Sequence, residues 1–139
     1  MRRPLRVLVV AGTRPEAVKL APLVLRLKRD RQFRVRLLST GQHRRLLDGA
    51  FAAFRLKPDA DLRLMRPGQA PARFLSLALA ALDRELARRP VDLVVVQGDT
   101  ARAAAAALAA FHRKVPVAHV EAGLRSGDLA APYPEELNR

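Results

Sequence analysis

The stretch LRVLVVAG, residues 5–12, decides the fold. Its first seven residues form a nearly unbroken apolar run rich in valine, typical of a strand buried on both faces of a parallel sheet. The run ends at Gly12, and a helical pattern follows in which apolar residues share one face. These residues are Ala17, Leu20, Ala21, Val24 and Leu27. A buried strand followed by an amphipathic helix is the repeating pair of an α/β protein.

The same alternation continues along the chain. Further strands are predicted at residues 33–40, 91–97 and 115–122, and further helices at 44–54, 72–88 and 100–112. Residues 57–71 are predicted to be a loop with at most a short strand, and no internal repeat or linker divides the sequence. We therefore expect one α/β domain over residues 1–139, a Rossmann-like doubly wound parallel sheet. In such sheets ligands bind beyond the carboxyl ends of the strands.

The composition excludes several classes of protein. Hydrophobic residues make up 50% of the chain, which is ample for a core, and there is no cysteine for a disulfide or a thiolate site. His43, His112 and His119 lack metal-ligand spacing, so we expect no metal. No apolar run approaches the roughly 20 residues needed to cross a bilayer. A soluble cytoplasmic protein without membrane association is the expectation.

The net charge of +13 comes almost wholly from arginines spread over nearly every segment. Because they form no single stripe and aromatic residues reach only 4%, we do not expect a nucleic-acid partner. A compositional bias, an acidic partner or an anionic substrate drawn to a basic cleft would each account for the charge.

The first strand ends in GTRPEAVK, residues 12–19. A single glycine fits neither the dinucleotide fingerprint nor the Walker A loop. Thr13 and Glu16 have capping-box spacing, which is a structural explanation. The functional alternative is an anion site, in which Arg14 and Lys19 add positive charge beside exposed helix amides.

The second and third strands also end in polar residues. After the second, TGQH (residues 40–43) is either a plain glycine turn or a way to project Gln42 and His43 into the crevice. After the third, Asp99 in QGDT is either the N-cap of the alanine-rich helix or a catalytic group, and one residue can do both.

The fourth strand ends in HVEAGLRSGD, residues 119–128. Glu121 lies at the tip of an apolar strand, where a carboxylate must be paired, hydrated by a cleft or raised in pKa. A functional role is favoured, with a purely structural salt bridge to Arg125 as the alternative. His119 is interpreted as a satisfied, semi-buried side chain.

The last eight residues, PYPEELNR, have the features of a helix start, with Pro134 at its first position. Glu135 and Glu136 suit the positive end of a helix dipole, and one of them adds a third carboxylate to Asp99 and Glu121. Carboxylates beside cations suit proton transfer coupled to departure of a phosphate leaving group.

The motifs GTRPEAVK, TGQH, QGDT, HVEAGLRSGD and PEELNR, in this order and spacing, resemble the N-terminal part of bacterial, non-hydrolysing UDP-N-acetylglucosamine 2-epimerases. The resemblance runs from the first residue to the last. It implies the N-terminal half of a two-domain glycosyltransferase-B architecture with the active site between the domains. It also implies interconversion of UDP-N-acetylglucosamine and UDP-N-acetylmannosamine without a cofactor, by anti elimination of UDP and its re-addition to 2-acetamidoglucal.

The resemblance implies a role for each matching residue. The catalytic carboxylates are Asp99, Glu121 and Glu135; the substrate-binding residues are Arg14, Lys19, Gln42, His43, Arg125 and Arg139. Within the latter set, Gln42 and His43 match a region associated with a second, regulatory UDP-sugar site in some members. One departure affects the third motif: the family usually continues with threonines after QGDT, whereas this chain continues with ARAAAAA. Hydroxyl contacts expected from those threonines are therefore in question.

The family's catalytic histidine and most of its uridine-binding residues belong to a second domain, which this chain lacks. We therefore expect the chain alone to be inactive, its terminal segment to be frayed, and the full-length enzyme to be a homodimer. The alternatives are a hydrolysing 2-epimerase that releases N-acetylmannosamine and UDP, a glycosyltransferase of the same architecture, and a non-catalytic UDP-sugar-binding subunit.

Overall fold

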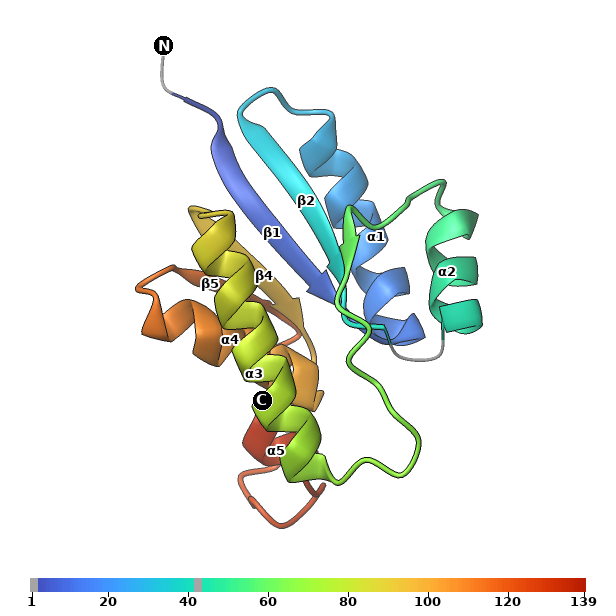
Figure 1. Ribbon diagram of the computed structural model, residues 1–139, viewed down its shortest axis with the longest axis vertical. Coiled ribbons are helices and arrows are strands. Elements are labelled where there is room, and N and C mark those ends of the chain that lie inside the picture. The colour runs from blue at the N-terminus through green and yellow to red at the C-terminus, as the bar shows by residue number, and fades with distance from the viewer. Residues whose placement is uncertain (1–2, 42–43) are drawn as a thin grey trace.

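A computed structural model describes residues 3–41 and 44–139 and contains a five-stranded, wholly parallel sheet within that part of the chain (Figure 1). The strands are β1 (Leu5–Ala11), β2 (Phe33–Ser39), β3 (Ala60–Asp61), β4 (Leu93–Gln97) and β5 (Val117–Val120). The helices are α1 (Arg14–Lys28), α2 (Arg44–Ala53), α3 (Pro71–Arg88), α4 (Ala101–His112) and α5 (Glu135–Asn138). The order β3-β2-β1-β4-β5 is that of a doubly wound Rossmann-like sheet, as the sequence predicts.

The central strand β1 pairs with β2 on one side, from Leu5↔Phe33 to Ala11↔Ser39, and with β4 on the other. The chain builds outward from β1 to β3, then crosses the sheet through α3 and builds outward again from β4 to β5. The strand order therefore reverses between β1 and β4. The carboxyl ends of these two strands form the switch point, where ligands bind in sheets of this kind.

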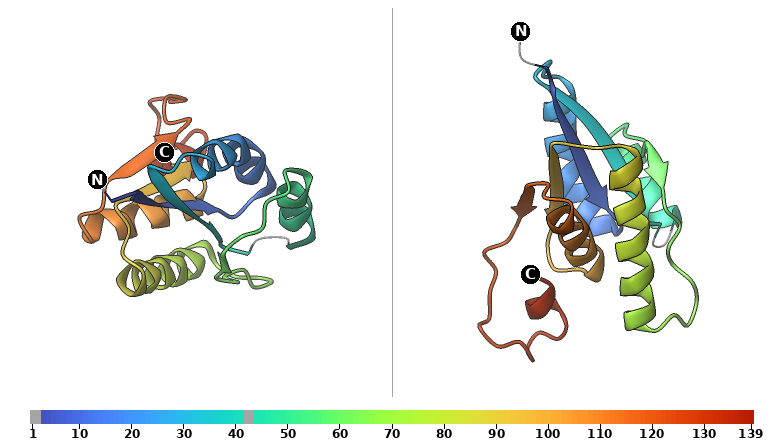
Figure 2. Two further views of the ribbon diagram at one scale, coloured as in Figure 1. Left: turned by 90° about the horizontal axis from the view of Figure 1, so that it is seen from above. Right: turned by 60° about the vertical axis from the view of Figure 1, so that its left-hand side comes forward.

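The sheet carries a separate apolar core on each face, and Figure 2 shows helices on both sides of it. Because successive side chains of a strand point to opposite faces, Val7 and Val9 pack toward α1 and α2, while Leu8 and Val10 pack toward α3 and α4. This arrangement explains why the sequence of β1 is apolar at consecutive positions.

The predicted and observed elements agree except near their ends. The fourth predicted strand, residues 115–122, is shorter in the structure because Glu121 adopts a positive φ of 63° that turns the chain out of the sheet. The predicted loop at residues 57–71 contains only the two-residue strand β3. No helix in the described ranges is long and apolar enough to cross a membrane.

The terminal segment differs from the expectation of a frayed end. Asn138 donates to the carbonyl of Asp99 at 3.0 Å, and Arg139 donates to the carbonyl of Leu124 at 2.6 Å. Helix α5 begins at Glu135, with Pro134 at its N-cap and not at its first helical position. The prediction of fraying is wrong, because side chains from α5 bond to the turn that follows β4.

Candidate active site at the carboxyl edge of the sheet

The turn between β1 and α1 is built around Glu16, which is 3% exposed. Its Oε2 accepts from the backbone N–H groups of Gly12 (2.6 Å) and Thr13 (2.9 Å), and Thr13 caps α1 in return. The predicted capping box is confirmed. The other oxygen, Oε1, accepts from the Thr100 hydroxyl at 2.5 Å, which fastens this turn to the start of α4.

Glycine is required at position 12 because the sheet edge is tightly packed there. A Cβ on Gly12 would lie 2.0 Å from Thr40 Oγ1 and 2.3 Å from Arg102 Cδ. No real side-chain carbon comes so close to its neighbours, so even alanine requires the surrounding groups to move.

Glu121 follows β5 and is partly buried, with 27% of its side chain exposed. Its Oε2 accepts from Lys19 Nζ at 2.6 Å and from Gln97 Nε2 at 2.6 Å. The hydrogen bond from Lys19 is the main cause that holds the pKa of Glu121 below its ordinary value; partial burial opposes it, and Gln97 and Arg139 add to it. The carboxylate is therefore ionised and held.

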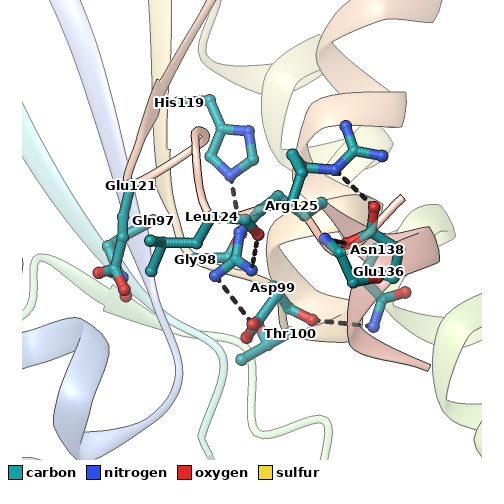
Figure 3. Close-up of polar contacts among 12 residues, drawn as sticks. Gln97, Gly98, Asp99, Thr100, His119, Glu121, Leu124, Arg125, Glu136 and Asn138 are labelled. Carbon is teal, nitrogen blue, oxygen red and sulfur yellow. Dashed lines mark hydrogen bonds and ion pairs between the residues drawn. The ribbon is translucent and has the colours of Figure 1, made fainter. Parts of the chain in front are cut away.

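The alternative prediction, a structural salt bridge between Glu121 and Arg125, is wrong. Arg125 Nε donates instead to Glu136 Oε1 at 2.9 Å (Figure 3). Glu136 is 1% exposed and also accepts from the backbone N–H groups of Ser126 (3.0 Å) and Gly127 (3.1 Å). These bonds, opposed by burial, hold the pKa of Glu136 at about 2, so this carboxylate organises the loop before α5.

The turn between β4 and α4 is held from three sides (Figure 3). His119 Nε2 donates to the carbonyl of Gly98 at 2.7 Å, and Asn138 donates to the carbonyl of Asp99 at 3.0 Å. Arg139 Nη2 lies 2.9 Å from Asp99 Oδ2. His119 is thus a satisfied side chain, as the sequence predicts. The proposed N-cap role of Asp99 is wrong, because Thr100 caps α4.

A cleft of about 430 Å³ opens at this edge. It brings together Lys19, Gln97, Asp99, Glu121 and Arg139, along with Thr13, Pro15, Glu16, Gly98 and Thr100. The cleft therefore combines three carboxylates, Glu16, Asp99 and Glu121, with the cations Lys19 and Arg139 at the switch point between β1 and β4.

Other predicted site residues lie elsewhere. Arg14 is exposed and lines a separate groove between α1 and α2, and Arg125 is engaged with Glu136. Glu135 is half-buried and is not among the residues that line the 430 Å³ cleft. Gln42 and His43 lie outside the described residues.

Three residues of the site were not predicted as such: Gln97, Thr100 and Asn138. All three are polar and lie within the motifs quoted above; Gln97 and Thr100 are at or just after the end of β4, which is a usable signal, whereas Asn138 lies in α5 and has no such signal. In the described ranges, no group of three or more His, Cys, Asp or Glu side chains is arranged to hold a metal ion.

A parallel α/β sheet with carboxylates and cations at its switch point defines a Rossmann-like domain with a charged cleft. Residues 25–139 match the family model described as UDP-N-acetylglucosamine 2-epimerase. The chain belongs to the UDP-N-acetylglucosamine 2-epimerase family.

Relatives and solved structures agree with this assignment. The chain is 48% identical over 135 residues to UDP-N-acetylglucosamine 2-epimerase of Salmonella typhimurium and 47% identical over 137 residues to that of Bacillus subtilis. These alignments cover 97% and 99% of the chain but only 36% of either relative, so the chain spans about a third of their length.

Several of the similar solved structures are named as nucleotide complexes. The Neisseria meningitidis UDP-GlcNAc 2-epimerase bound to UDP-GlcNAc is 43% identical with a TM-score of 0.93, covering 97% of this chain and 36% of that one. The Methanocaldococcus jannaschii enzyme in complex with UDP-GlcNAc and UDP is 34% identical with a TM-score of 0.89, covering 97% of this chain and 37% of that one.

Proposed function

We propose that this chain forms one wall of the active site of a non-hydrolysing UDP-N-acetylglucosamine 2-epimerase with glycosyltransferase-B architecture. The observation that carries the proposal is the meeting of Asp99, Glu121, Lys19 and Arg139 around one cleft at the switch point of the sheet. The nucleotides named for the Neisseria and Methanocaldococcus relatives support UDP-N-acetylglucosamine as the substrate.

The charges suit an elimination followed by an addition. A carboxylate removes the proton from C2 of the sugar, the C–H electron pair forms the C1=C2 double bond, and the C1–O pair leaves with UDP. The intermediate is 2-acetamidoglucal. When UDP adds back and C2 is protonated from the opposite face, the product is UDP-N-acetylmannosamine. Because protons move on both faces, more than one acid–base group is required.

We assign these proton transfers to the carboxylates Asp99 and Glu121, with Glu135 as a third group whose position outside the described cleft gives it less support. Lys19 and Arg139 place two positive charges on the same cleft, where they favour the negative charge that develops on the departing diphosphate. Substrate-binding roles for Arg14 and Arg125 rest on the sequence resemblance alone.

We also propose that activity requires a second domain, since the relatives are much longer than this chain. Several apolar side chains around α4 and β5 support contact with further polypeptide. Leu108, Phe111, Val117 and Leu137 line one groove and are 43%, 73%, 36% and 66% exposed. The chain by itself is then expected to show no turnover.

The proposed function is tested by fusing this chain to the remainder of the Bacillus subtilis relative, in place of the 36% that it matches. NMR of the products should show UDP-N-acetylmannosamine formed from UDP-N-acetylglucosamine by the fusion and not by the 139-residue chain. Release of free N-acetylmannosamine and UDP would instead identify the hydrolysing reaction. A folded fusion that yields neither product would overturn the proposal.

The dimer and the second UDP-sugar site are proposed from the resemblance, and the location and nucleic-acid predictions from composition and charge. A homodimer predicts that the fusion sediments at twice its calculated mass, and sedimentation at the monomer mass would contradict it. A cytoplasmic location and a lack of nucleic-acid binding stay predictions from the sequence, as does a second UDP-sugar site at Gln42 and His43.

A further inference from the structure

The two carboxylate oxygens of Glu121 have different surroundings. Oε2 accepts from both Lys19 Nζ and Gln97 Nε2, each at 2.6 Å. Oε1 accepts no hydrogen bond from any residue that the structure describes. One oxygen is therefore saturated by two donors, while the other keeps its lone pairs available.

Gln97 is the more rigid of the two donors. It is the last residue of β4 and is 4% exposed, whereas the Lys19 side chain is 48% exposed. In the parallel ladder Gln97 lies opposite Val120, the residue immediately before Glu121. A buried amide N–H costs free energy when it lacks an acceptor, so this hydrogen bond constrains both side chains.

The backbone of Glu121 is also constrained. Its φ of 63° lies in the left-handed region, which residues with a Cβ seldom adopt. Such conformations persist where surrounding contacts hold them, and they are concentrated at functional sites. Here the left-handed turn ends β5 and sends the chain away from the sheet, while the Glu121 side chain stays bonded to β4 and α1.

We propose that Gln97 is a positioning residue, which together with Lys19 fixes Glu121 Oε2 and leaves Oε1 as the atom that exchanges the C2 proton. This rests on the proposed function. In the elimination, an Oε1 lone pair takes the proton, the C–H pair forms the C1=C2 bond, and UDP departs with the C1–O pair. The fixed position of Glu121 Oε1 matters because small displacements of a catalytic group reduce rates strongly.

The charges around Glu121 fit a base that is ready to accept a proton. Lys19 faces it from α1, Gln97 from β4 and Arg139 from the chain end after α5, while Asp99 lines the same cleft. The two cations favour the ionised carboxylate, and Gln97 contributes a donor without adding charge. Replacing Gln97 therefore tests how the orientation and the pKa of Glu121 depend on this hydrogen bond, while the positive charges of Lys19 and Arg139 stay in place.

The first experiment uses the 139-residue chain itself, with ¹³C-labelled glutamate carboxylates titrated by NMR. In Gln97→Met, which keeps the length but removes the donor, the pKa of Glu121 should rise; in Gln97→Glu it should rise further because a second carboxylate is added. The pKa of Glu136, about 2 in the parent, is the internal control and should not move. An unchanged Glu121 titration in both variants would overturn the positioning role.

The second experiment measures the fusion with the Bacillus subtilis relative. Gln97→Met should lower kcat by about tenfold to a hundredfold with little change in KM, and should move the acid limb of the pH profile to higher pH. Gln32→Met, the same change on an exposed residue before β2, is the matched control and should leave kcat unchanged. A Gln97→Met fusion with parental kcat and pH profile would also contradict the proposal.

The two experiments separate the proposed function from the positioning role. An inactive parent fusion would count against the proposed function. The NMR titration of the 139-residue chain tests the hydrogen bond between Gln97 and Glu121 and needs no enzymatic activity.

Discussion

The two ends of the sheet each hold a carboxylate beside cations, yet the two carboxylates are bonded differently. At the amino end, Asp92 Oδ1 accepts from Arg3 Nη2 (2.9 Å) and Arg6 Nη2 (3.0 Å). Its Oδ2 accepts from the backbone N–H of Arg6 (2.9 Å) and from Arg6 Nε (3.1 Å). At the carboxyl end, Glu121 accepts hydrogen bonds from the described residues through Oε2 alone. The pKa of each carboxylate is lowered by cationic hydrogen-bond donors, so the pKa alone does not distinguish them.

The number of carboxylate oxygens that accept hydrogen bonds does distinguish Asp92 from Glu121. Glu16 and Glu136 resemble Asp92, because both of their oxygens accept hydrogen bonds and both residues fasten turns. Asp99 resembles Glu121, with an ion pair from Arg139 to Oδ2 alone. Asp92, Glu16 and Glu136 are bonded through both oxygens and hold turns and strand ends together, although Glu16 also lines the cleft. Glu121 and Asp99 also line the cleft, and each keeps one oxygen to which no described residue donates a hydrogen bond.

The largest expected effect is the loss of activity on Glu121→Gln in the fusion with the Bacillus subtilis relative. An amide cannot accept the C2 proton as a carboxylate does, so kcat should fall by about a thousandfold. Asp92→Asn is the matched control, because it neutralises a carboxylate at the opposite end of the sheet. Steady-state kinetics should show near-parental kcat for Asp92→Asn. Equal losses of kcat in the two variants would contradict a catalytic role specific to Glu121.

The next effect concerns the packing of the carboxyl edge. Gly12→Ala places a carbon 2.0 Å from Thr40 Oγ1, so we expect a loss of about 1–3 kcal/mol in the free energy of unfolding. Gly49→Ala, within α2 and with nothing near its added carbon, should stabilise the chain by about 0.5–1 kcal/mol. Urea unfolding measures the change in the free energy of unfolding for each variant. Changes of the same sign in the two variants would contradict the tight packing inferred at Gly12.

A smaller effect is the acid sensitivity that Glu136 gives to the fold. Its pKa is about 2 in the folded chain against 4.5 for an ordinary glutamate, so its stabilisation is fully present above about pH 4.5. That contribution is lost as the pH falls from 4.5 to about 2, because in this window the unfolded chain takes up a proton at Glu136 and the folded chain does not. Thermal unfolding followed at several pH values should show a shallower decline in this window for Glu136→Gln. An identical fall in stability for the parent and Glu136→Gln would mean that protonation of Glu136 does not cause the acid sensitivity.

The sequence predicts the strands and helices well because burial on two faces imposes continuous apolar runs on the strands, and burial on one face imposes an amphipathic pattern on the helices. It also predicts that Asp99, Glu121 and Lys19 meet, since the carboxyl ends of parallel strands share one edge. It does not predict the partner of Arg125 or the cap of α4. The partner of Arg125 depends on the path of the chain after Glu121, which a left-handed residue redirects, whereas the cap of α4 is a local choice between the neighbours Asp99 and Thr100.

Gln97 illustrates the other limit of sequence reasoning. Its place at the end of a strand is evident, but its hydrogen bond to Glu121 follows from the register of β4 and β5, in which Gln97 lies opposite Val120. A polar residue at a strand end becomes informative only when the neighbouring strand is placed beside it.

We propose that the carboxyl edge of the sheet supplies proton transfer at C2 of a UDP-sugar. This proposal is tested most directly by incubating the fusion with UDP-N-acetylglucosamine in deuterated water and recording the C2 signals by NMR. We expect deuterium at C2 of the UDP-N-acetylmannosamine that forms. Epimerisation that retains the original hydrogen at C2, or a folded fusion that forms no epimer, would contradict it.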